Sequence, residues 1–147
     1  MPAASPNCIF CKIIRREAAA SIVLEDDITL AFMDILPMTP GHTLVVPKSH
    51  AAYIEDMREG NVGPILETAR KVAAALRRSG LRCEAVNLYL ANGKEAGQEV
   101  FHVHMHVIPR FRGDGFGIRV GPDYGRVAAR EDLEAIAAKI RDAIRDQ

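Results

Sequence analysis

Five short runs in the middle of the chain are rich in β-branched and apolar residues and are separated by turn-forming residues, a pattern typical of β-strands. They span residues 21–25, 29–35, 43–46, 86–91 and 99–108. Because Asp26-Asp27 separates the first two runs, these two are expected to form a hairpin. Strands are therefore predicted to dominate the middle of the chain.

Apolar residues return at helical spacing in three other segments. In residues 64–78 they recur every three or four positions, and Ser79-Gly80 supplies a stop, which predicts one long helix. Residues 8–16 are typical of one or two helical turns. The last segment is predicted to be an amphipathic helix with these residues on one face: Leu133, Ile136, Ala137, Ile140 and Ile144. We expect one domain over residues 1–147, an antiparallel α+β sheet with helices on one side.

Composition narrows the class of ligand. Of the 147 residues, 48% are apolar and 26% are charged, as in an ordinary globular protein. The 19 Lys and Arg residues balance the 19 Asp and Glu residues, so the formal net charge is zero. A protein that binds long nucleic acid through its phosphates is expected to carry a basic surplus. A small anionic ligand fits this balance better than a nucleic acid does.

Membrane and export signals are not expected. No stretch approaches the roughly 20 apolar residues that span a bilayer. Residues 1–7 have neither the basic start nor the apolar run of a signal peptide. The three cysteines, Cys8, Cys11 and Cys83, are too few and odd in number for a disulfide framework. We therefore predict a cytoplasmic protein.

The most informative stretch is Phe101-His-Val-His-Met-His-Val-Ile-Pro109. Since the side chains of a strand alternate between its faces, His102, His104 and His106 are expected to share one face. The residues between them are apolar and suit a core. The pattern therefore predicts a row of imidazoles on one side of the sheet.

Three chemical interpretations fit such a row. Binding of one metal ion by all three histidines would be strained, because the outer two lie roughly 13 Å apart along a strand. Zinc–nitrogen bonds measure only about 2.1 Å. Two of the three histidines can share a metal ion. Neutral imidazoles suit nucleophilic attack and acid–base work at phosphorus. Ordinary packing histidines are disfavoured by the strict alternation of three on one face.

The segment His102-Val-His-Met-His-Val-Ile108 matches the signature of the histidine triad (HIT) family, in which three histidines alternate with apolar residues. Four more blocks are similar to that family in sequence and order: 8–14, 31–35, 40–50 and 96–102. Residues 110–117 resemble its bacterial members. The resemblance covers roughly residues 8–117 and implies a HIT-like fold. That fold has a sheet of about five antiparallel strands, one long inserted helix and a short N-terminal helix, here followed by a C-terminal helix in the extension 118–147.

The resemblance implies a role for each histidine. The middle histidine of the family is the nucleophile, so His104 is expected to attack the α-phosphate of a nucleotide and become nucleotidylated. His106 is expected to bind the phosphate and stabilise the transition state, while His102 orients the others or binds a metal. A related uridylyl-transferase branch carries Gln where this chain has His106. The chain therefore resembles the hydrolases of the family.

The resemblance also implies where the nucleotide binds. Asp34 matches the acid that accepts hydrogen bonds from the ribose hydroxyls. The positions that sandwich the base are matched by Phe10, Ile13, Phe32 and Ile35. The other implied contacts, mostly in the loop that enters the histidine strand, are His42, Asn92, Gly97, Gln98 and Glu99. Glycine lets backbone N–H groups of that loop approach phosphate oxygens. Some relatives carry a small hydroxyl residue instead of Glu99, so this carboxylate argues against narrow phosphoramidate specificity.

A zinc site is predicted from two sources. Cys8-x-x-Cys11 has the spacing of half a zinc site, although two reduced thiols without metal would show the same spacing. The resemblance to bacterial relatives implies that His50 and His102 complete the site. Two thiolates and two imidazoles form a closed tetrahedral site, so this zinc is expected to be structural and not catalytic.

The favoured function is that of a hydrolase or nucleotidyl transferase that releases a nucleoside monophosphate from purine nucleotide conjugates. The expected substrates are adenosine phosphoramidates, aminoacyl-adenylates or diadenosine polyphosphates, with no redox cofactor. The resemblance implies a homodimer. Three alternatives stay open: a nucleotide-binding adaptor or sensor with negligible turnover, a zinc-binding protein, and, less favoured by the neutral charge, a DNA-repair deadenylase.

Overall fold

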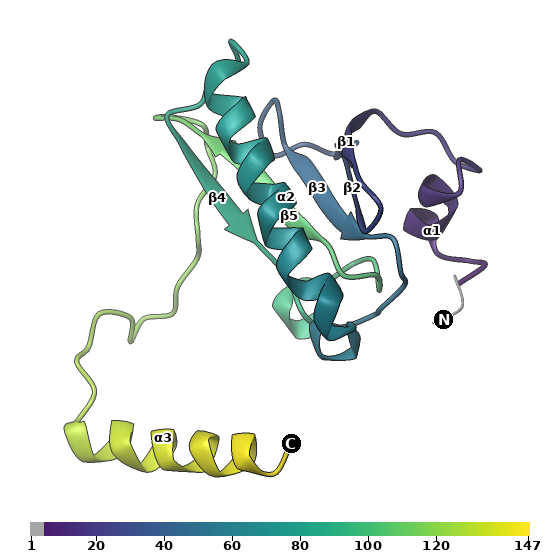
Figure 1. Ribbon diagram of the computed structural model, residues 1–147. Helices are drawn as coiled ribbons and strands as arrows, with labels where there is room; N and C mark the ends of the chain where they lie inside the picture. The colour runs from purple at the N-terminus through teal and green to yellow at the C-terminus, as the bar shows by residue number, and fades with distance from the viewer. Residues whose placement is uncertain (1–4) are drawn as a thin grey trace. The chain divides into compact units, whose positions relative to one another are not determined.

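The chain divides into two compact units in the computed structural model, which describes residues 5–147 (Figure 1). The first unit, up to Phe116, holds the sheet and all five histidines of the chain. The second, Gly117–Gln147, holds one helix, α3 (Arg130–Arg145).

The first unit is built on one antiparallel sheet of five strands in the order β1-β2-β3-β5-β4. Its elements in chain order are α1 (Ile9–Ile14), β1 (Ile22–Glu25), β2 (Thr29–Met33), β3 (Thr43–Pro47), η1 (Ile54–Asp56), α2 (Glu59–Arg78), β4 (Ala85–Tyr89), η2 (Lys94–Ala96) and β5 (Met105–Arg110). The hairpin predicted around Asp26-Asp27 is present as β1 and β2. The predicted α+β class, with about five strands and one long inserted helix, is confirmed.

The histidine strand is shorter than the alternation predicted. β5 begins at Met105 and not at residue 99, because its ladder with β3 ends at Val45. Upstream of that point the N–H of Val103 donates to the carbonyl of Ala51 at 2.8 Å, outside the sheet. Of the three alternating histidines, two therefore lie in the segment that leads into β5 and one lies in the strand itself.

The long helix is longer than predicted. α2 begins at Glu59, ahead of residue 64, and runs through Pro64 in its second turn. Gly60 and Gly63 have low helix propensity, which hides this first turn from the sequence pattern. Pro64 has no N–H to donate to the carbonyl of Gly60, so the second turn of α2 lacks one backbone hydrogen bond.

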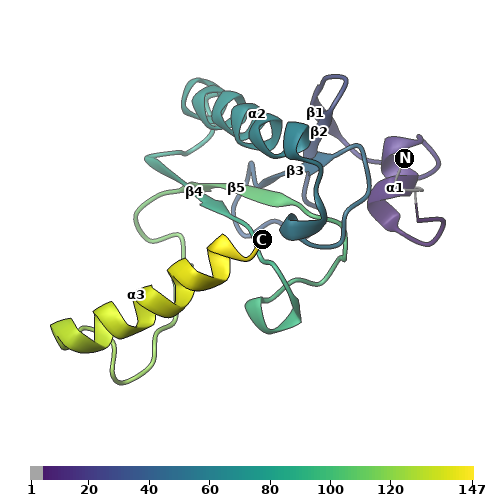
Figure 2. The same ribbon diagram turned by 60° about the horizontal axis from the view of Figure 1, so that its bottom comes forward.

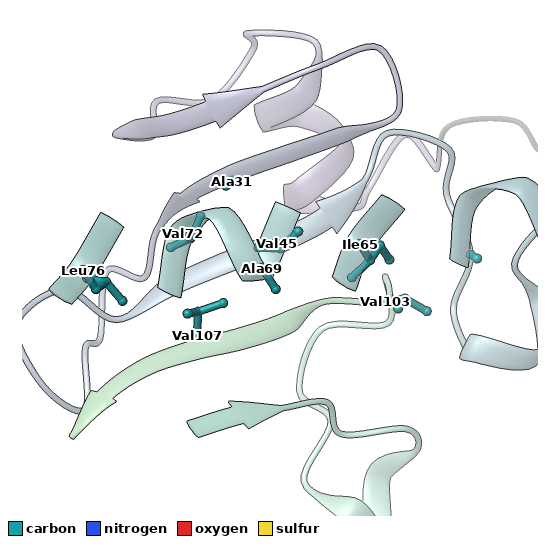
Figure 3. Close-up of a cluster of buried hydrophobic side chains, with 9 residues drawn as sticks. Ala31, Val45, Ile65, Ala69, Val72, Leu76, Val103 and Val107 are labelled. Carbon is teal, nitrogen blue, oxygen red and sulfur yellow. The ribbon is translucent and has the colours of Figure 1, made fainter. Parts of the chain in front are cut away.

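Helix α2 covers one face of the sheet (Figure 2). Alternate residues of β2, β3 and β5 pack against its apolar stripe in a cluster (Figure 3) that consists of Ala31, Val45, Ala51, Ile65, Ala69, Val72, Leu76, Val103 and Val107. The intervening residues of β2 and β3 face the other way and pack against α1 in a second cluster: Phe10, Ile13, Leu30, Phe32, Leu44 and Val46. The expectation of helices on one side only is therefore wrong, because α1 buries its apolar residues on the face opposite to α2.

Helix α3 forms where its apolar spacing predicts it, and none of its residues is buried. Its stripe residues are 44–60% exposed: Leu133, Ile136, Ile140 and Ile144. Within residues 5–147, none of the helices is both long and apolar enough to cross a membrane.

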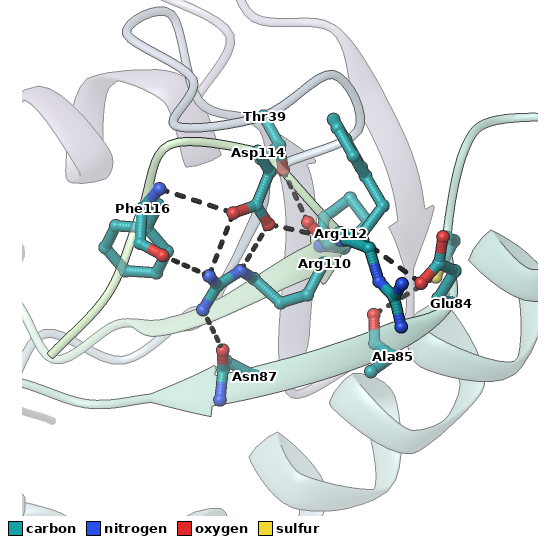
Figure 4. A network of polar contacts seen from close by, with 11 residues as sticks. Thr39, Glu84, Ala85, Asn87, Arg110, Arg112, Asp114 and Phe116 are labelled. Carbon is teal, nitrogen blue, oxygen red and sulfur yellow. Dashed lines mark hydrogen bonds and ion pairs between the residues drawn. The ribbon is translucent and has the colours of Figure 1, made fainter.

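A network around Arg110 fixes the chain where it leaves the sheet (Figure 4). The guanidinium of Arg110 donates to both carboxylate oxygens of Asp114, at 2.7 and 3.0 Å, and to Oδ1 of Asn87 at 2.7 Å. It also donates to the carbonyl of Phe116, whose ring it covers at 4.3 Å. These hydrogen bonds hold the pKa of Asp114 far below its usual range. The segment after β5 is therefore pinned to the β4–β5 edge.

Replacing Asp114 by Ala is expected to lower the melting temperature by roughly 5 °C, because the Arg110 guanidinium loses its bidentate acceptor. Circular dichroism during heating measures the change. The matched control is Asp123→Ala, since the Asp123–Arg126 pair is about 80% exposed on both sides and contributes little. Equal melting temperatures for the two variants would contradict this assignment.

Candidate active site

The predicted row of histidines lies on the α1 face of the sheet. The rings of His104 and His106 are 4.9 Å apart, and the ring of Phe10 from α1 stands edge-on to His104 at 5.1 Å and to His102 at 5.8 Å. His102 is fully buried and His104 is 6% exposed. Helix α1 therefore forms one wall around these imidazoles.

A backbone carbonyl decides which ring nitrogen of His104 carries the proton. Its Nδ1 lies 2.8 Å from the carbonyl oxygen of His102, and a carbonyl only accepts, so Nδ1 carries the proton. Burial lowers the pKa of His104 more than the carbonyl contact and the carboxylates of Asp34 and Glu99 raise it. A neutral ring protonated at Nδ1 keeps its lone pair on Nε2. His104 is thus arranged as a nucleophile or a base at Nε2.

His106 has the opposite arrangement, set by His42. The N–H of Met38 donates to Nδ1 of His42 at 3.1 Å, so the proton of neutral His42 is on Nε2. That N–H donates to Nδ1 of His106 at 2.8 Å, which leaves the proton of His106 on Nε2. Burial lowers the pKa of His42, and it lowers the pKa of His106 to about 4. His106 is therefore a neutral hydrogen-bond donor beside His104.

Asp34 lies at the end of β2 beside this chain of hydrogen bonds. Its Oδ2 is 3.5 Å from Nε2 of His42, and its Oδ1 accepts from the N–H of Leu36 at 2.9 Å. The potential ligand atoms of Asp34, His42 and His106 lie within 4.8 Å of one another. Because both nitrogens of His42 already take part in hydrogen bonds, this cluster fits a hydrogen-bond chain with fixed proton positions better than a metal site.

The four predicted base contacts divide into two groups. Phe10, Ile13 and Phe32 are 2–7% exposed and belong to the second cluster, which packs between α1 and the sheet. Ile35 is 88% exposed in the loop after β2. The structure thus brings Ile35, next to Asp34, to the surface and places the other three in the wall behind the histidines. Their contact with a base stays a prediction.

The glycine-containing loop between β4 and β5 is closed by its own hydrogen bonds. The N–H groups of Ala96, Gly97 and Gln98 donate to carbonyls inside the loop at 2.9–3.1 Å, so they differ from the free phosphate donors expected there. The amide of Gln98, 3% exposed, accepts from the N–H of Gly93 and donates to the carbonyls of Ala52 and Val100. Gln98 therefore fixes the base of the loop.

The remaining loop residues point to different tasks. Asn92 accepts from the N–H of Ile54 at 2.9 Å and donates to Glu55, so its amide ties the loop to η1. Glu99 is exposed, and its negative charge raises the pKa of His104. The same negative charge repels any anion that approaches His104.

Two groups at the site were not predicted from the sequence. The Met38 N–H, which sets the proton on His42, belongs to a backbone position and leaves no side-chain signal. Tyr89 of β4 lies opposite His106 in the strand register, with the two rings 5.5 Å apart. Alternation along 86–91 could have placed Tyr89 on one face, but the register was needed to pair it with His106.

Four predicted metal ligands meet beside the histidine row. Nδ1 of His102 lies 3.4 Å from Sγ of Cys8, 3.6 Å from Sγ of Cys11 and 3.2 Å from Nδ1 of His50. In tetrahedral zinc sites, bonds of about 2.3 Å to sulfur and 2.1 Å to nitrogen place the ligand atoms roughly 3.3–3.8 Å apart. Nε2 of His102 donates to the carbonyl of Pro47 at 2.8 Å, so Nδ1 keeps its lone pair for a metal. The donor set and its spacing fit a closed Zn²⁺ site.

Comparisons with known proteins show which family the chain resembles. A family model of the HIT domain matches residues 15–113. A HIT-like protein of Borreliella burgdorferi is 48% identical over 78% of this chain and 84% of its own length. The adenosine 5'-monophosphoramidase of Schizosaccharomyces pombe is 35% identical over 95% of this chain and 99% of its own length.

Solved structures give the same result. The crystal structure of a HIT family protein from Bacillus anthracis has a TM-score of 0.85 at 39% identity, and the match covers 95% of this chain and 98% of that one. A zinc-bound histidine triad family protein from Mycobacterium smegmatis has a TM-score of 0.73 at 37% identity, with 93% and 97% of the two chains covered. The family model spans well over half of the chain, and the relatives align along most of it. The chain belongs to the HIT family.

Proposed function

We propose that this protein is a nucleotide hydrolase that acts at the α-phosphate of purine nucleotide conjugates through a nucleotidyl group on His104. The observation that carries the proposal is the hydrogen-bond pattern of two rings 4.9 Å apart, from which we infer a lone pair on Nε2 of His104 and an N–H on Nε2 of His106. One ring supplies the nucleophile, and its neighbour supplies a hydrogen-bond donor for the phosphate oxygens.

The reaction has two steps. In the first, Nε2 of His104 forms a bond to phosphorus, the bond to the leaving group breaks, and the leaving group takes a proton from water. In the second, the hydroxide left from that water forms a bond to phosphorus, and the bond to His104 breaks. His106 keeps its proton throughout and stabilises the negative charge on the phosphoryl oxygens. The products are a nucleoside monophosphate and the protonated leaving group.

Adenosine phosphoramidate is the first substrate to test. The relative from Schizosaccharomyces pombe, which matches 95% of this chain, is an adenosine 5'-monophosphoramidase. Asp34 is proposed to accept hydrogen bonds from the ribose hydroxyls, and Ile35 to contact the base. Exposed Glu99 stands where some relatives carry a small hydroxyl residue and argues against a specificity confined to phosphoramidates, so a diadenosine polyphosphate is the second substrate to test.

Zinc is proposed to be held by Cys8, Cys11, His50 and His102. When bound it supplies a closed structural centre that joins α1 to the segment before β5, with no open coordination position for chemistry. The fit of the four ligand atoms and the zinc-bound relative from Mycobacterium smegmatis support this proposal. The predicted homodimer and the cytoplasmic location stay predictions.

We expect kcat/KM to decrease in acid only below pH 6.5, the ordinary pKa of histidine. His104 must be neutral to attack phosphorus, and burial lowers its pKa. A lowered pKa keeps the ring neutral to lower pH, so kcat/KM should be flat through pH 6.5 and fall only in more acidic solution. Steady-state rates between pH 4.5 and 8 test this. An acid limb at or above pH 6.5 would show that the nucleophile is not the buried, neutral imidazole.

The function itself is tested by product formation from an adenosine phosphoramidate and, in parallel, from a diadenosine polyphosphate. AMP release, faster from the phosphoramidate, is the expected result. If the protein binds AMP but releases none from either substrate, the hydrolase proposal is wrong, and the nucleotide-binding adaptor or sensor is favoured. Zinc binding without any affinity for AMP would favour a zinc-binding protein.

A further inference from the structure

Tyr89 occupies a place beside the active site to which the two proposed steps assign no role. It stands directly opposite His106 in the β4–β5 ladder, and the two rings are 5.5 Å apart at an interplanar angle of 53°. The side chain is 45% exposed, so one part of the ring contacts His106 while another part faces solvent. His106 is thus flanked by three rings: His42 just before β3, His104 just before β5, and Tyr89 in β4.

The hydroxyl of Tyr89 reaches a second part of the site. It donates to the carbonyl of Ala96 at 2.8 Å, at the tip of the loop between β4 and β5. Gly93 and Gly97 flank this tip with φ values of 103° and 94°, in a region that glycine adopts freely. The base of the loop is fixed by Gln98, so the Tyr89 hydroxyl is a second anchor at the tip.

We propose that Tyr89 is a positioning residue that holds the tip of this loop against the strand bearing His106 and keeps the His106 ring in place. The proposal rests on the proposed hydrolase function. It assigns two separable tasks to one side chain, because the hydroxyl contacts the loop and the ring contacts the histidine. Without this anchor, a loop with glycines at both ends of its tip would leave the segment that leads from it to His104 and His106 less ordered, and substrate binding would have to order it at an entropic cost.

The two tasks predict different kinetic effects. Tyr89→Phe keeps the ring and removes the hydroxyl, so KM should rise roughly fivefold, the equivalent of one neutral hydrogen bond, with kcat nearly unchanged. Tyr89→Leu also removes the ring, so kcat should fall roughly tenfold in addition, because His106 loses a neighbour that orients it. A purely structural role would lower the melting temperature without this division between KM and kcat.

The experiment compares wild type, Tyr89→Phe and Tyr89→Leu in the phosphoramidate assay, with AMP affinity by calorimetry and the ring nitrogen signals of His106 by NMR. Tyr53→Phe is the matched control, since Tyr53 is 41% exposed and packs on Phe101. Melting temperatures of all variants show whether each one folds. The expected result is weaker AMP binding in both Tyr89 variants and altered His106 signals in Tyr89→Leu only.

Failure of the inference differs from failure of the function. If wild type turns over the substrate and the folded Tyr89 variants match it in KM, kcat and AMP affinity, Tyr89 has no positioning role. If wild type does not turn over at all, the hydrolase proposal fails, and AMP affinity together with the His106 signals still decides the role of Tyr89. Equal effects from Tyr53→Phe would also overturn the assignment.

Discussion

Replacing His104 by Ala is expected to lower kcat for AMP release by more than about 10³-fold, because the covalent route loses its attacking atom. The lone pair on Nε2 of His104 is fixed by the 2.8 Å contact of Nδ1 with the His102 carbonyl, and Ala offers no substitute for it. Steady-state and single-turnover rates on adenosine phosphoramidate measure the loss. AMP affinity should change little, since the ribose and phosphate contacts proposed for Asp34 and His106 remain.

The matched comparison for this variant is His106→Ala. It removes a donor and keeps the nucleophile, so a smaller loss of roughly 10²-fold is expected. If the two variants lose equal activity, or if His104→Ala keeps more than a tenth of the wild-type rate, the division of labour between the two rings is wrong. A melting curve for each variant shows that the loss is not one of folding.

Replacing Cys11 by Ser is expected to abolish stoichiometric zinc binding and to lower the melting temperature by at least about 8 °C, because a structural metal contributes folding free energy. Cys11 is 2% exposed, and its Sγ lies 3.4 Å from Nδ1 of His50. Zinc content by elemental analysis and a thermal melt measure both effects. Removal of zinc from wild type with a strong chelator should reproduce the lower melting temperature.

Cys83 provides the control for this variant. It is the third cysteine, its thiol donates to the carbonyl of Ala85 at 3.4 Å, and it lies outside the metal cluster. Cys83→Ser should therefore keep the zinc and most of the stability. Purified wild type without zinc, with a melting temperature equal to that of Cys11→Ser, would show that Cys8 and Cys11 are reduced thiols with no metal.

His102 links the proposed zinc centre to the nucleophile. Its Nδ1 faces the other ligands, its Nε2 donates to the carbonyl of Pro47, and its own carbonyl accepts the hydrogen bond from Nδ1 of His104 that fixes that ring. A shift of His102 would therefore misorient His104. This contact gives a physical reason for the proposed structural metal to lie beside the residues proposed to be catalytic.

Much of the fold was predictable from apolar spacing. Alternation and helical periodicity predicted the hairpin, β3, β4 and the helices. The apolar spacing marks these elements even where their residues stay exposed, as in β4 and α3. The start of β5 and the first turn of α2 were not predictable, because ladder partners and tertiary packing decide them. The position of α1 on the second face was also hidden, since the sequence shows an apolar stripe but not the surface that it meets.

The candidate site was predictable in its residue types and not in its proton arrangement. The alternating histidines pointed to phosphorus chemistry, and the Cys-x-x-Cys spacing to half of a metal site. The hydrogen bonds from Met38 to His42 and from His42 to His106 connect segments distant in sequence. No spacing rule reveals them. Burial of Phe10 and Phe32 behind the row likewise depends on how α1 packs.

The central claim is a covalent bond between the nucleotide and His104. The most direct test mixes enzyme with adenosine phosphoramidate, stops the reaction in alkali within the first turnover, and maps the modified peptides by mass spectrometry. We predict a peptide containing His104 that carries one adenylyl group, and its absence from His104→Ala. AMP formed in the same time with no adduct on any histidine would contradict the account, because water would then attack the phosphorus directly.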